Sequence, residues 1–356
     1  MSVQPFNLTE IGSLASQIGA SAPACKDIPS SSSSALRVAP KAYSGSLDKY
    51  ASFKVTPNIG LEFSNLPLAS LTDQQIEDLS ILISQHNVVV IRGAHLTPQQ
   101  LLDIGRKIAT PKGTLHIHPI TAEIPGRSEL DELTVVSNEI VYGGENAPAS
   151  DGWHSDISFE PNPSSYAALQ IVQGPDAGGD TQFSSGYAAY DRLSKPLQRF
   201  LETLNGENDG NAFHEVANKS NIKIREKRGA ANVGTDLRSV HPLVRTNPVT
   251  GWKSLYVSKA FTKRIVELPK SESDLLLNFL FNHIAQGFDF STRVKWNPGD
   301  IAFWDNRSTY HAATKDFDES ILRRGIRVVP LGERPYLDPA SVSKSEAVKA
   351  VKDAKL

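Results

Sequence analysis

Residues 300–331, DIAFWDNRSTYHAATKDFDESILRRGIRVVPL, contain the pattern that decides the expected fold. Short apolar runs at Asp300–Trp304 and Leu322–Leu331 predict two strands, and a polar stretch separates them. Similar runs occur upstream, at Tyr166–Gln173, Thr181–Ser184, His241–Thr246, Ser254–Val257 and Phe288–Trp296. Many short strands with few helices between them predict a β-sandwich or barrel with flanking helices, which is a mainly β fold of the α+β type.

Helices are expected beside the strands. Thr72-Asp73-Gln74-Gln75 and Thr97-Pro98-Gln99-Gln100 each place a glutamine three residues after a threonine, which is the capping box that begins a helix. The apolar run Asn87–Arg92 between them predicts a buried strand. Two further helices are expected to begin at Ser194 and at Ser271.

The expected domain spans residues 53–336. Residues 1–52 are predicted to form a flexible N-terminal extension, because Ser30–Ser34 is a low-complexity run, and residues 337–356 to form a C-terminal tail. Residues 205–240 are polar, contain glycine and lack periodic apolar positions. A stretch of this length suggests a lid-like insertion or binding loop.

Composition excludes several classes of protein. The net charge of −2 gives no reason to expect nucleic acid or an anionic membrane as a partner. Cys25 is the only cysteine, which rules out an internal disulfide and favours a reducing compartment. No apolar run reaches the roughly 20 residues of a membrane span, and the N-terminus does not resemble a signal peptide. A cytoplasmic location is expected.

The C-terminus offers a second location. Ala354-Lys355-Leu356 is a close variant of the Ser-Lys-Leu peroxisomal address. A solvated tail containing Lys349 and Lys352 is the alternative interpretation.

Trp153-His154-Ser155-Asp156 is the first candidate for metal binding. On an extended strand, His154 and Asp156 point to the same face and can converge on one ion. His311 supplies a second histidine. Two histidines and one carboxylate are the ligand set of non-haem Fe(II) oxygenases, which leaves positions open for co-substrate and oxygen. A His-x-Asp triplet alone is common by chance, so the surrounding residues matter.

The arginines after His311 strengthen this interpretation. If residues 323–327 are extended, Arg323, Gly325 and Arg327 share one face, the glycine leaves room between two guanidinium groups, and Arg324 points away. A guanidinium binds a carboxylate through two parallel charge-assisted bonds. Such an arginine beside an iron site suits the distal carboxylate of 2-oxoglutarate.

The chain resembles the taurine dioxygenase family, which also includes aryloxyacetate, sulfonate and sulfate-ester dioxygenases. The resemblance covers roughly Leu66 to Tyr336 and implies a double-stranded β-helix, the cupin-like jelly roll. The matching motifs are Trp153-His154-Ser155-Asp156, Gly178-Gly179-Asp180-Thr181, His241-Pro242-Leu243-Val244-Arg245-Thr246, Phe261-Thr262-Lys263-Arg264-Ile265 and Trp304-Asp305-Asn306-Arg307, with the spacing from His311 to the arginine pair.

The resemblance implies Fe(II), 2-oxoglutarate and O2 as cofactor and co-substrates. The implied site residues are the iron ligands His154, Asp156 and His311, the 2-oxoglutarate contacts Thr181 and Arg323, and the substrate contacts His118, Phe261 and Arg327. The implied reaction hydroxylates a small anionic substrate and releases succinate and CO2. Asp156 favours hydroxylation over halogenation, since related halogenases leave that position free for chloride.

The substrate is expected to be an alkyl sulfonate. A sulfate ester, a carboxylate such as an aryloxyacetate and a secondary-metabolite intermediate stay open, because Thr121 and Ser150 replace a tyrosine and an asparagine of the taurine-binding pattern. Phe213 and His214 lie in the lid-like stretch and cannot be assigned from the sequence. The resemblance allows a homo-oligomer.

Two other classes fit part of the pattern. A cupin-like metal hydrolase or isomerase would not need Arg323, and a non-catalytic sensor would need only the fold. The histidines with no convergent partners in the sequence are expected to be structural, namely His86, His95, His116, His241 and His283. Trp153 and Trp304 are expected to pack against the barrel wall.

Overall fold

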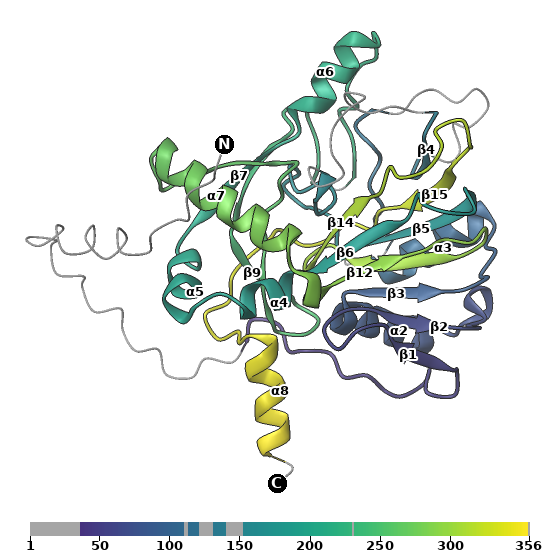
Figure 1. Cartoon of the computed structure of the whole chain (residues 1–356), viewed down its shortest axis with the longest axis horizontal. Helices are drawn as coiled ribbons and strands as arrows, with labels where there is room; N and C mark the ends of the chain where they lie inside the picture. The colour runs from purple at the N-terminus through teal and green to yellow at the C-terminus, as the bar shows by residue number, and fades with distance from the viewer. Residues whose placement is uncertain (1–35, 110–112, 121–130, 140–151, 230, 355–356) are drawn as a thin grey trace, which may run out of the picture. The chain divides into compact units, whose positions relative to one another are not determined.

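The computed structural model describes residues 36–109, 113–120, 131–139, 152–229 and 231–354 (Figure 1). Its largest feature is a seven-stranded sheet of order β1-β2-β3-β13-β5-β15-β4, in which only the β2–β3 pair is parallel. The strands are β1 (Ser52–Lys54), β2 (Leu61–Phe63), β3 (Val88–Ile91), β4 (Leu133–Ser137), β5 (Tyr166–Gln173), β13 (Ile301–Asp305) and β15 (Arg324–Val328).

Smaller sheets complete the strand content. One three-stranded sheet has the order β12-β6-β14, another the order β11-β7-β8, and β10 pairs with β9. Their bounds are β6 (Thr181–Ser185), β7 (Asn205–Asp209), β8 (Arg238–Pro242), β9 (Val244–Thr246), β10 (Lys253–Leu255), β11 (Thr262–Ile265), β12 (Ser291–Val294) and β14 (Thr309–Ala313).

Both faces of the large sheet are buried. Val89 and Ile91 of β3 belong to a core shared with α2 (Asp73–His86) and α3 (Pro98–Ile108). Val88 and Val90 point the other way, into a second core that contains Phe183 of β6. Side chains alternate along a strand, so the all-apolar β3 can serve both cores. The large sheet therefore has helices on one face and the β12-β6-β14 sheet on the other.

The helix starts agree with the sequence signals. Thr72 and Thr97 form capping boxes with Gln75 and Gln100, and Pro98 occupies the first turn of α3. The other helices in the described residues are α4 (Gly186–Asp191), α5 (Lys195–Leu201), α6 (Asn211–Lys219), α7 (Lys270–Ala285) and α8 (Lys344–Asp353), with 3-10 turns η1 (Leu68–Ser70) and η4 (Phe288–Phe290). No helix in the described part of the chain has the length and apolar character needed to cross a membrane.

Two expected strands differ in detail. The run His241–Thr246 is divided between β8 and β9, because Pro242 has no N–H with which to continue a ladder. The run Phe288–Trp296 begins with the turn η4, where Phe290 N–H bonds Gly287 O at 3.0 Å, before β12 starts at Ser291.

The prediction that residues 205–240 form one irregular stretch is wrong at both ends. β7 is the middle strand of its sheet, α6 follows it, and β8 begins at Arg238. The buried positions of β7 are Gly206 and Asn208, so no apolar alternation marks the strand. Asn208 instead accepts hydrogen bonds from the hydroxyls of Ser158 and Thr262, at 3.2 and 2.9 Å.

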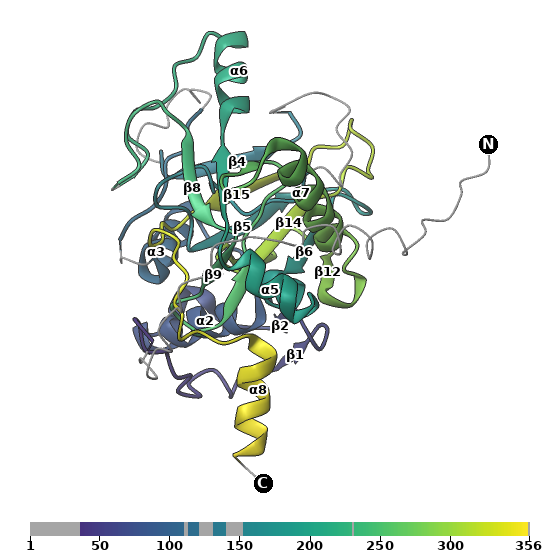
Figure 2. The same cartoon turned by 90° about the vertical axis from the view of Figure 1, so that its left-hand side faces the viewer.

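The domain bounds also need correction. Residues 36–52, expected within the flexible extension, pack on the compact part: Leu47 is 1% exposed, and Ser44 and Ser46 hydrogen-bond the buried Asp78 carboxylate. In the expected C-terminal tail, Asp338 is buried and its N–H donates to Thr246 Oγ1 at 2.8 Å. Figures 1 and 2 place α8 at the opposite end of this unit from α6.

Candidate metal centre

The two histidines of the predicted triad are brought together by backbone pairing. His154 and His311 form an antiparallel bridge with N–H···O distances of 3.1 and 2.9 Å. The expected strand at His154 is therefore a single bridge, and a turn begins at Asp156, with Ile157 at a positive φ of 49°. The Asp156 carboxylate still lies beside both imidazoles.

The ligand atoms of His154, Asp156 and His311 all lie within 4.8 Å of one another. Asp156 Oδ1 is 3.7 Å from His154 Nε2 and 3.8 Å from His311 Nε2. Within the described residues, this is the one group of three or more His, Cys, Asp or Glu side chains that could hold a metal ion. Two imidazoles and one carboxylate form the facial triad suited to Fe(II).

The imidazoles are oriented for metal binding. His154 Nδ1 lies 2.6 Å from Gly152 O, so Nδ1–H donates to that carbonyl and Nε2 keeps its lone pair. His311 packs beside Trp304, with ring centroids 4.7 Å apart. Burial, together with the neighbouring His154, lowers the pKa of His311 to about 3. His311 is therefore neutral at pH 7, which is the form that binds a metal.

Asp156 is held by Asn306 and Arg327. Asn306 Oδ1 accepts the N–H of Asp156 at 3.0 Å, and Asn306 Nδ2 lies 3.3 Å from Asp156 Oδ2. Arg327 Nη1 donates to Asp156 Oδ1 at 2.9 Å. Burial alone would raise the pKa of the Asp156 carboxyl, but Arg327 and His311 hold it well below its ordinary value. The carboxylate is thus ionised, with Oδ1 on the side of the imidazoles.

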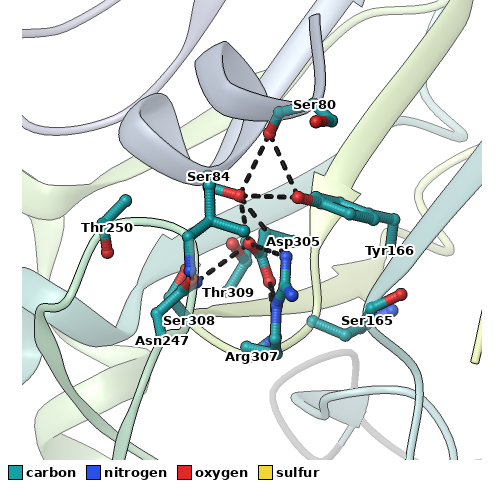
Figure 3. A network of polar contacts seen from close by, with 12 residues as sticks. Ser80, Ser84, Ser165, Tyr166, Asn247, Thr250, Asp305, Arg307, Ser308 and Thr309 are labelled. Atoms are coloured by element: carbon teal, nitrogen blue, oxygen red, sulfur yellow. Dashed lines mark hydrogen bonds and ion pairs between the residues drawn. The ribbon is translucent and has the colours of Figure 1, made fainter. Parts of the chain in front are cut away.

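A buried network surrounds Asp305 and Arg307, the two residues on either side of Asn306 in the chain (Figure 3). Arg307 donates to Asp305 from Nε and Nη2, both at 2.8 Å, and its guanidinium lies 4.4 Å from the centre of the Tyr166 ring. Ser84 Oγ donates to Asp305 Oδ2 at 2.7 Å. Since Asp305 and Arg307 flank Asn306 in the chain, this network holds the turn that presents Asn306 to Asp156. The sequence identified Asp305, Asn306 and Arg307 only as part of a family motif and did not point to Ser84 or Tyr166 as their partners.

Thr181 lies on the same face as His311. In the β6–β14 pair, Phe183 is opposite His311 and Thr181 is opposite Ala313, and directly opposed residues share a face. Thr181 Oγ1 accepts a hydrogen bond from Trp296 Nε1 at 3.1 Å. The Thr181 hydroxyl can therefore still donate its proton to an anion.

Arg323 is buried with part of its guanidinium unused. Its Nε donates to Gly179 O at 2.6 Å, and its Nη2 has no hydrogen-bond partner within the described part of the chain. Burial lowers the pKa of Arg323, and Asp180 only partly offsets that effect. A buried cation with a free donor is the local condition for binding an anion.

The strand after Arg323 differs from the expected regular alternation. A register shift between Arg324 and Gly325 interrupts its pairing with β5. A Cβ on Gly325 would lie 2.8 Å from Gln170 O, so the glycine is required by the neighbouring strand and not by two guanidinium groups. Arg324 points away, as predicted, and pairs with Glu139 at 2.6 Å.

Two of the predicted substrate contacts adjoin the triad, since Arg327 bonds Asp156 and Phe261 lies beside His154. Phe261 is 5.9 Å from the His154 ring, and His118 meets the edge of Phe213 at 5.2 Å. His118 is buried, and burial together with Arg327 lowers its pKa to about 3. Arg327 Nε is buried without a hydrogen-bond partner among the described residues. Thr121 and Ser150 lie outside the described residues.

No sequence signal pointed to Phe159, and none assigned a role to Phe213. The Phe159 ring lies 5.1 Å from Phe261 and 5.3 Å from Phe213, which makes a three-ring cluster next to His154. Phe159 follows Asp156 by three residues, but a phenylalanine at that spacing is not distinctive. Only the turn at 156–160 brings it to the cluster.

Fold and site together define a non-haem iron dioxygenase that depends on 2-oxoglutarate. The family model described as taurine catabolism dioxygenase TauD, TfdA family matches residues 51–329, and the chain belongs to this family.

Three relatives illustrate the range of similarity. The chain is 38% identical to an alpha-ketoglutarate-dependent sulfonate dioxygenase of Saccharomyces cerevisiae, over 80% of this chain and 68% of the relative. It is 39% identical to the alpha-ketoglutarate-dependent dioxygenase btcD of Neocamarosporium betae, over 85% and 96%. A solved taurine dioxygenase from Burkholderia xenovorans is 28% identical, with a TM-score of 0.65 and coverage of 82% and 92%.

Proposed function

We propose that this dioxygenase hydroxylates a small anionic substrate, an alkyl sulfonate, while 2-oxoglutarate is converted to succinate and CO2. The observation that carries the proposal is a pair of guanidinium groups, each with a nitrogen that has no hydrogen-bond partner among the described residues: Arg323 is buried, and Arg327, which is partly exposed, bonds the Asp156 carboxylate. Arg323 keeps a free donor, and Arg327 keeps a free Nε. A metal hydrolase or isomerase would not need the free donor of Arg323.

The three ligands would hold Fe(II), and their donor set fits that ion. When bound, the iron supplies the activation of oxygen that the reaction requires. His154 and His311 would bind through Nε2, and Asp156 through Oδ1. Asn306 keeps the other carboxylate oxygen occupied, so that the carboxylate presents a single atom to the metal.

Thr181 and Arg323 would bind 2-oxoglutarate. The sequence predicted both residues for this role. Thr181 Oγ1 accepts from Trp296 and can still donate its proton, and Arg323 Nη2 has no acceptor among the described residues. Arg323 would pair with the distal carboxylate, which supplies the missing acceptor and compensates the buried charge.

The substrate would lie between Arg327, His118 and the three rings. Arg327 and His118 offer polar contacts for an anionic group, and Phe159, Phe213 and Phe261 offer apolar contacts for a carbon chain. The name of the yeast relative favours a sulfonate. The btcD relative is named without a substrate, so a sulfate ester, an aryloxyacetate-like carboxylate or a secondary-metabolite intermediate is the alternative.

We also propose a finer architecture, which the family membership supports. The large sheet and the β12-β6-β14 sheet would form a double-stranded β-helix, with the metal ligands at one end. The part of residues 205–240 between β7 and β8, which carries Phe213, would act as the lid over the substrate. Residues 53–336 would remain the core of the dioxygenase domain, extended by the packed residues 36–52 and 337–343.

Spectroscopy followed by turnover tests the function. Anaerobic addition of Fe(II) and 2-oxoglutarate should produce the visible metal-to-ligand charge-transfer band. Oxygen is then admitted with a panel of alkyl sulfonates, sulfate esters and aryloxyacetates, and succinate and hydroxylated product are measured by mass spectrometry. Absence of the band contradicts the dioxygenase assignment. A band with product only from carboxylates contradicts the sulfonate assignment.

We also propose that Ala354-Lys355-Leu356 directs the enzyme to peroxisomes, with the cytoplasm as the alternative. The first turn of α8 is attached through Ser345 Oγ to Asp191, at 2.8 Å, and α8 has no buried residue. Lys355 and Leu356 themselves lie outside the described residues. A fluorescent reporter carrying the last ten residues should become punctate, and a diffuse signal contradicts the proposal.

A further inference from the structure

Glu160 is a fully buried carboxylate that belongs to neither the metal group nor the predicted substrate contacts. Arg228, also fully buried, donates to it from Nε to Oε1 at 2.5 Å and from Nη2 to Oε2 at 3.0 Å. His116 Nε2 lies 3.1 Å from Oε1. Burial alone would raise the pKa of Glu160, and His116 and Arg228 hold it below its ordinary value. The pair is thus a carboxylate and a guanidinium in bidentate contact.

Arg228 also forms hydrogen bonds with backbone carbonyls of its own segment. Its Nη1 donates to Arg225 O and Gly234 O, both at 2.5 Å. We call residues 225–229 and 231–234 the Arg228 loop. Gly234 N–H bonds Glu226 O at 2.8 Å, which closes the ends of this loop on each other. The guanidinium therefore links the Arg228 loop to the turn that contains Glu160.

The Arg228 loop is attached to the backbone on both sides of His118. Ile117 N–H donates to Arg228 O at 3.0 Å, and Arg225 N–H donates to Pro119 O at 3.0 Å. His116, two residues before His118, contacts Glu160 directly. Glu160 thus holds the His118 segment through two routes, one by His116 and one by Arg228.

Glu160 ends the same turn that begins with a metal ligand. Asp156 opens the turn, Phe159 contributes a ring to the cluster, and Glu160 N–H bonds Ile157 O at 2.9 Å. Because the turn is short and closed by this hydrogen bond, Asp156 and Glu160 can move little relative to each other. The distance between the metal group and His118 therefore depends on the Glu160–Arg228 contact.

We propose that Glu160 and Arg228 are positioning residues that fix the substrate's anionic contact, His118, relative to the metal. This inference rests on the proposed function, in which His118 contacts the substrate. Stability alone does not explain the pair, because apolar residues of similar volume often replace a buried ion pair without loss. A bidentate contact adds a defined direction, which apolar packing lacks.

The test compares Glu160→Gln, Arg228→Met and the double variant with the wild-type enzyme loaded with Fe(II) and 2-oxoglutarate under anaerobic conditions. The charge-transfer band reports binding of metal and 2-oxoglutarate. The shift of that band on titration with pentane-1-sulfonate reports the substrate Kd. Arg92→Met is the control, since it removes an ion pair with Glu62 and Asp300 elsewhere in the large sheet.

We expect the Kd for pentane-1-sulfonate to rise about tenfold or more in Arg228→Met and in the double variant. The 2-oxoglutarate affinity should stay within about twofold of wild type. The double variant should regain the thermal stability that each single variant loses, because no buried charge is left unpaired. If the double variant recovers its stability while its affinity for the substrate stays low, the pair positions His118 and does not merely stabilise the fold.

Three outcomes overturn an assignment. A stable double variant with wild-type substrate Kd overturns the positioning role. An equal loss of 2-oxoglutarate affinity does the same, because the pair would then act on the metal centre. A wild-type enzyme whose band forms without a shift by pentane-1-sulfonate contradicts the sulfonate assignment instead, and phenoxyacetate then replaces it as the probe in the same comparison.

Discussion

Asn306 and Asp156 are joined by two hydrogen bonds in opposite directions. The Asn306 side-chain oxygen accepts the Asp156 N–H, and the Asn306 amide nitrogen donates to the Asp156 carboxylate. The amide cannot be turned round, because Oδ1 also accepts from Trp304 Nε1 at 3.0 Å and Nδ2 donates to Ser164 Oγ at 2.9 Å. Asn306 thereby holds Asp156 Oδ2, while Oδ1, which accepts from Arg327, lies beside the two histidines.

Replacing Asn306 with alanine should weaken metal binding. The variant frees Asp156 Oδ2 and leaves the buried N–H of Asp156 without its acceptor. Loss of such an outer contact typically costs about 10- to 100-fold in metal affinity. Calorimetric titration of the protein with Co(II) measures the change. Ser164→Ala is the control, since it removes a side-chain partner of Asn306 and leaves both Asn306–Asp156 hydrogen bonds in place. An unchanged Kd in Asn306→Ala would falsify the orienting role.

Asp156→Ala should abolish both metal binding and succinate production. The substitution removes the carboxylate that lies beside both imidazoles, and it leaves Arg327 Nη1 without its partner. Co(II) titration and a succinate assay with 2-oxoglutarate measure the two effects. Unchanged succinate production would contradict the assignment of the triad.

Arg323→Gln should raise the KM for 2-oxoglutarate about 10- to 100-fold, as a charge-assisted hydrogen bond of about 1.5–3 kcal/mol is lost. The neighbouring Arg324→Gln is a matched control, because Arg324 is exposed and pairs with Glu139. The KM for the organic substrate should change little in either variant. Equal effects at the two positions would show that general charge, and not the buried guanidinium, governs 2-oxoglutarate binding.

His241 should make the folded state less stable in mild acid. It is 2% exposed, its Nε2 is 3.0 Å from Glu160 O, and its Nδ1 has no hydrogen-bond partner in the described structure. Burial, with Arg245 nearby, lowers its pKa to about 4. The unfolded value is about 6.5, so the folded state favours the neutral ring. The stabilisation is therefore complete above about pH 6.5 and is lost as the pH falls towards 4.

The size of this effect follows from linkage. Between pH 7 and pH 5, His241 should account for a fall of about 2 kcal/mol in the free energy of unfolding. Urea unfolding of wild type and His241→Gln in EDTA at both pH values measures it, because the other histidines contribute equally to both proteins. Identical pH dependence in the two proteins would show that His241 does not titrate as described.

Local signals in the sequence predicted local structure well. The capping boxes at Thr72 and Thr97 begin helices where expected, and Tyr166–Gln173 is a strand with the expected bounds. A cap acts within one helical turn and an apolar run within one strand, so both can be read without knowing the fold. β7 was missed because its buried positions are glycine and asparagine.

The chemistry of the site could also be predicted from the types of residue in the sequence. A His-x-Asp with a later histidine and two arginines predicts Fe(II) and 2-oxoglutarate, because imidazole and carboxylate groups suit the metal and a guanidinium suits a carboxylate. Only the tertiary structure decided how they are held. Three contacts join segments that are distant in the chain: the bridge between His154 and His311, the hydrogen bonds between Asn306 and Asp156, and the ion pair between Glu160 and Arg228. Such contacts depend on which strands and turns become neighbours in the folded chain. The local sequence around each residue therefore does not predict its distant partner.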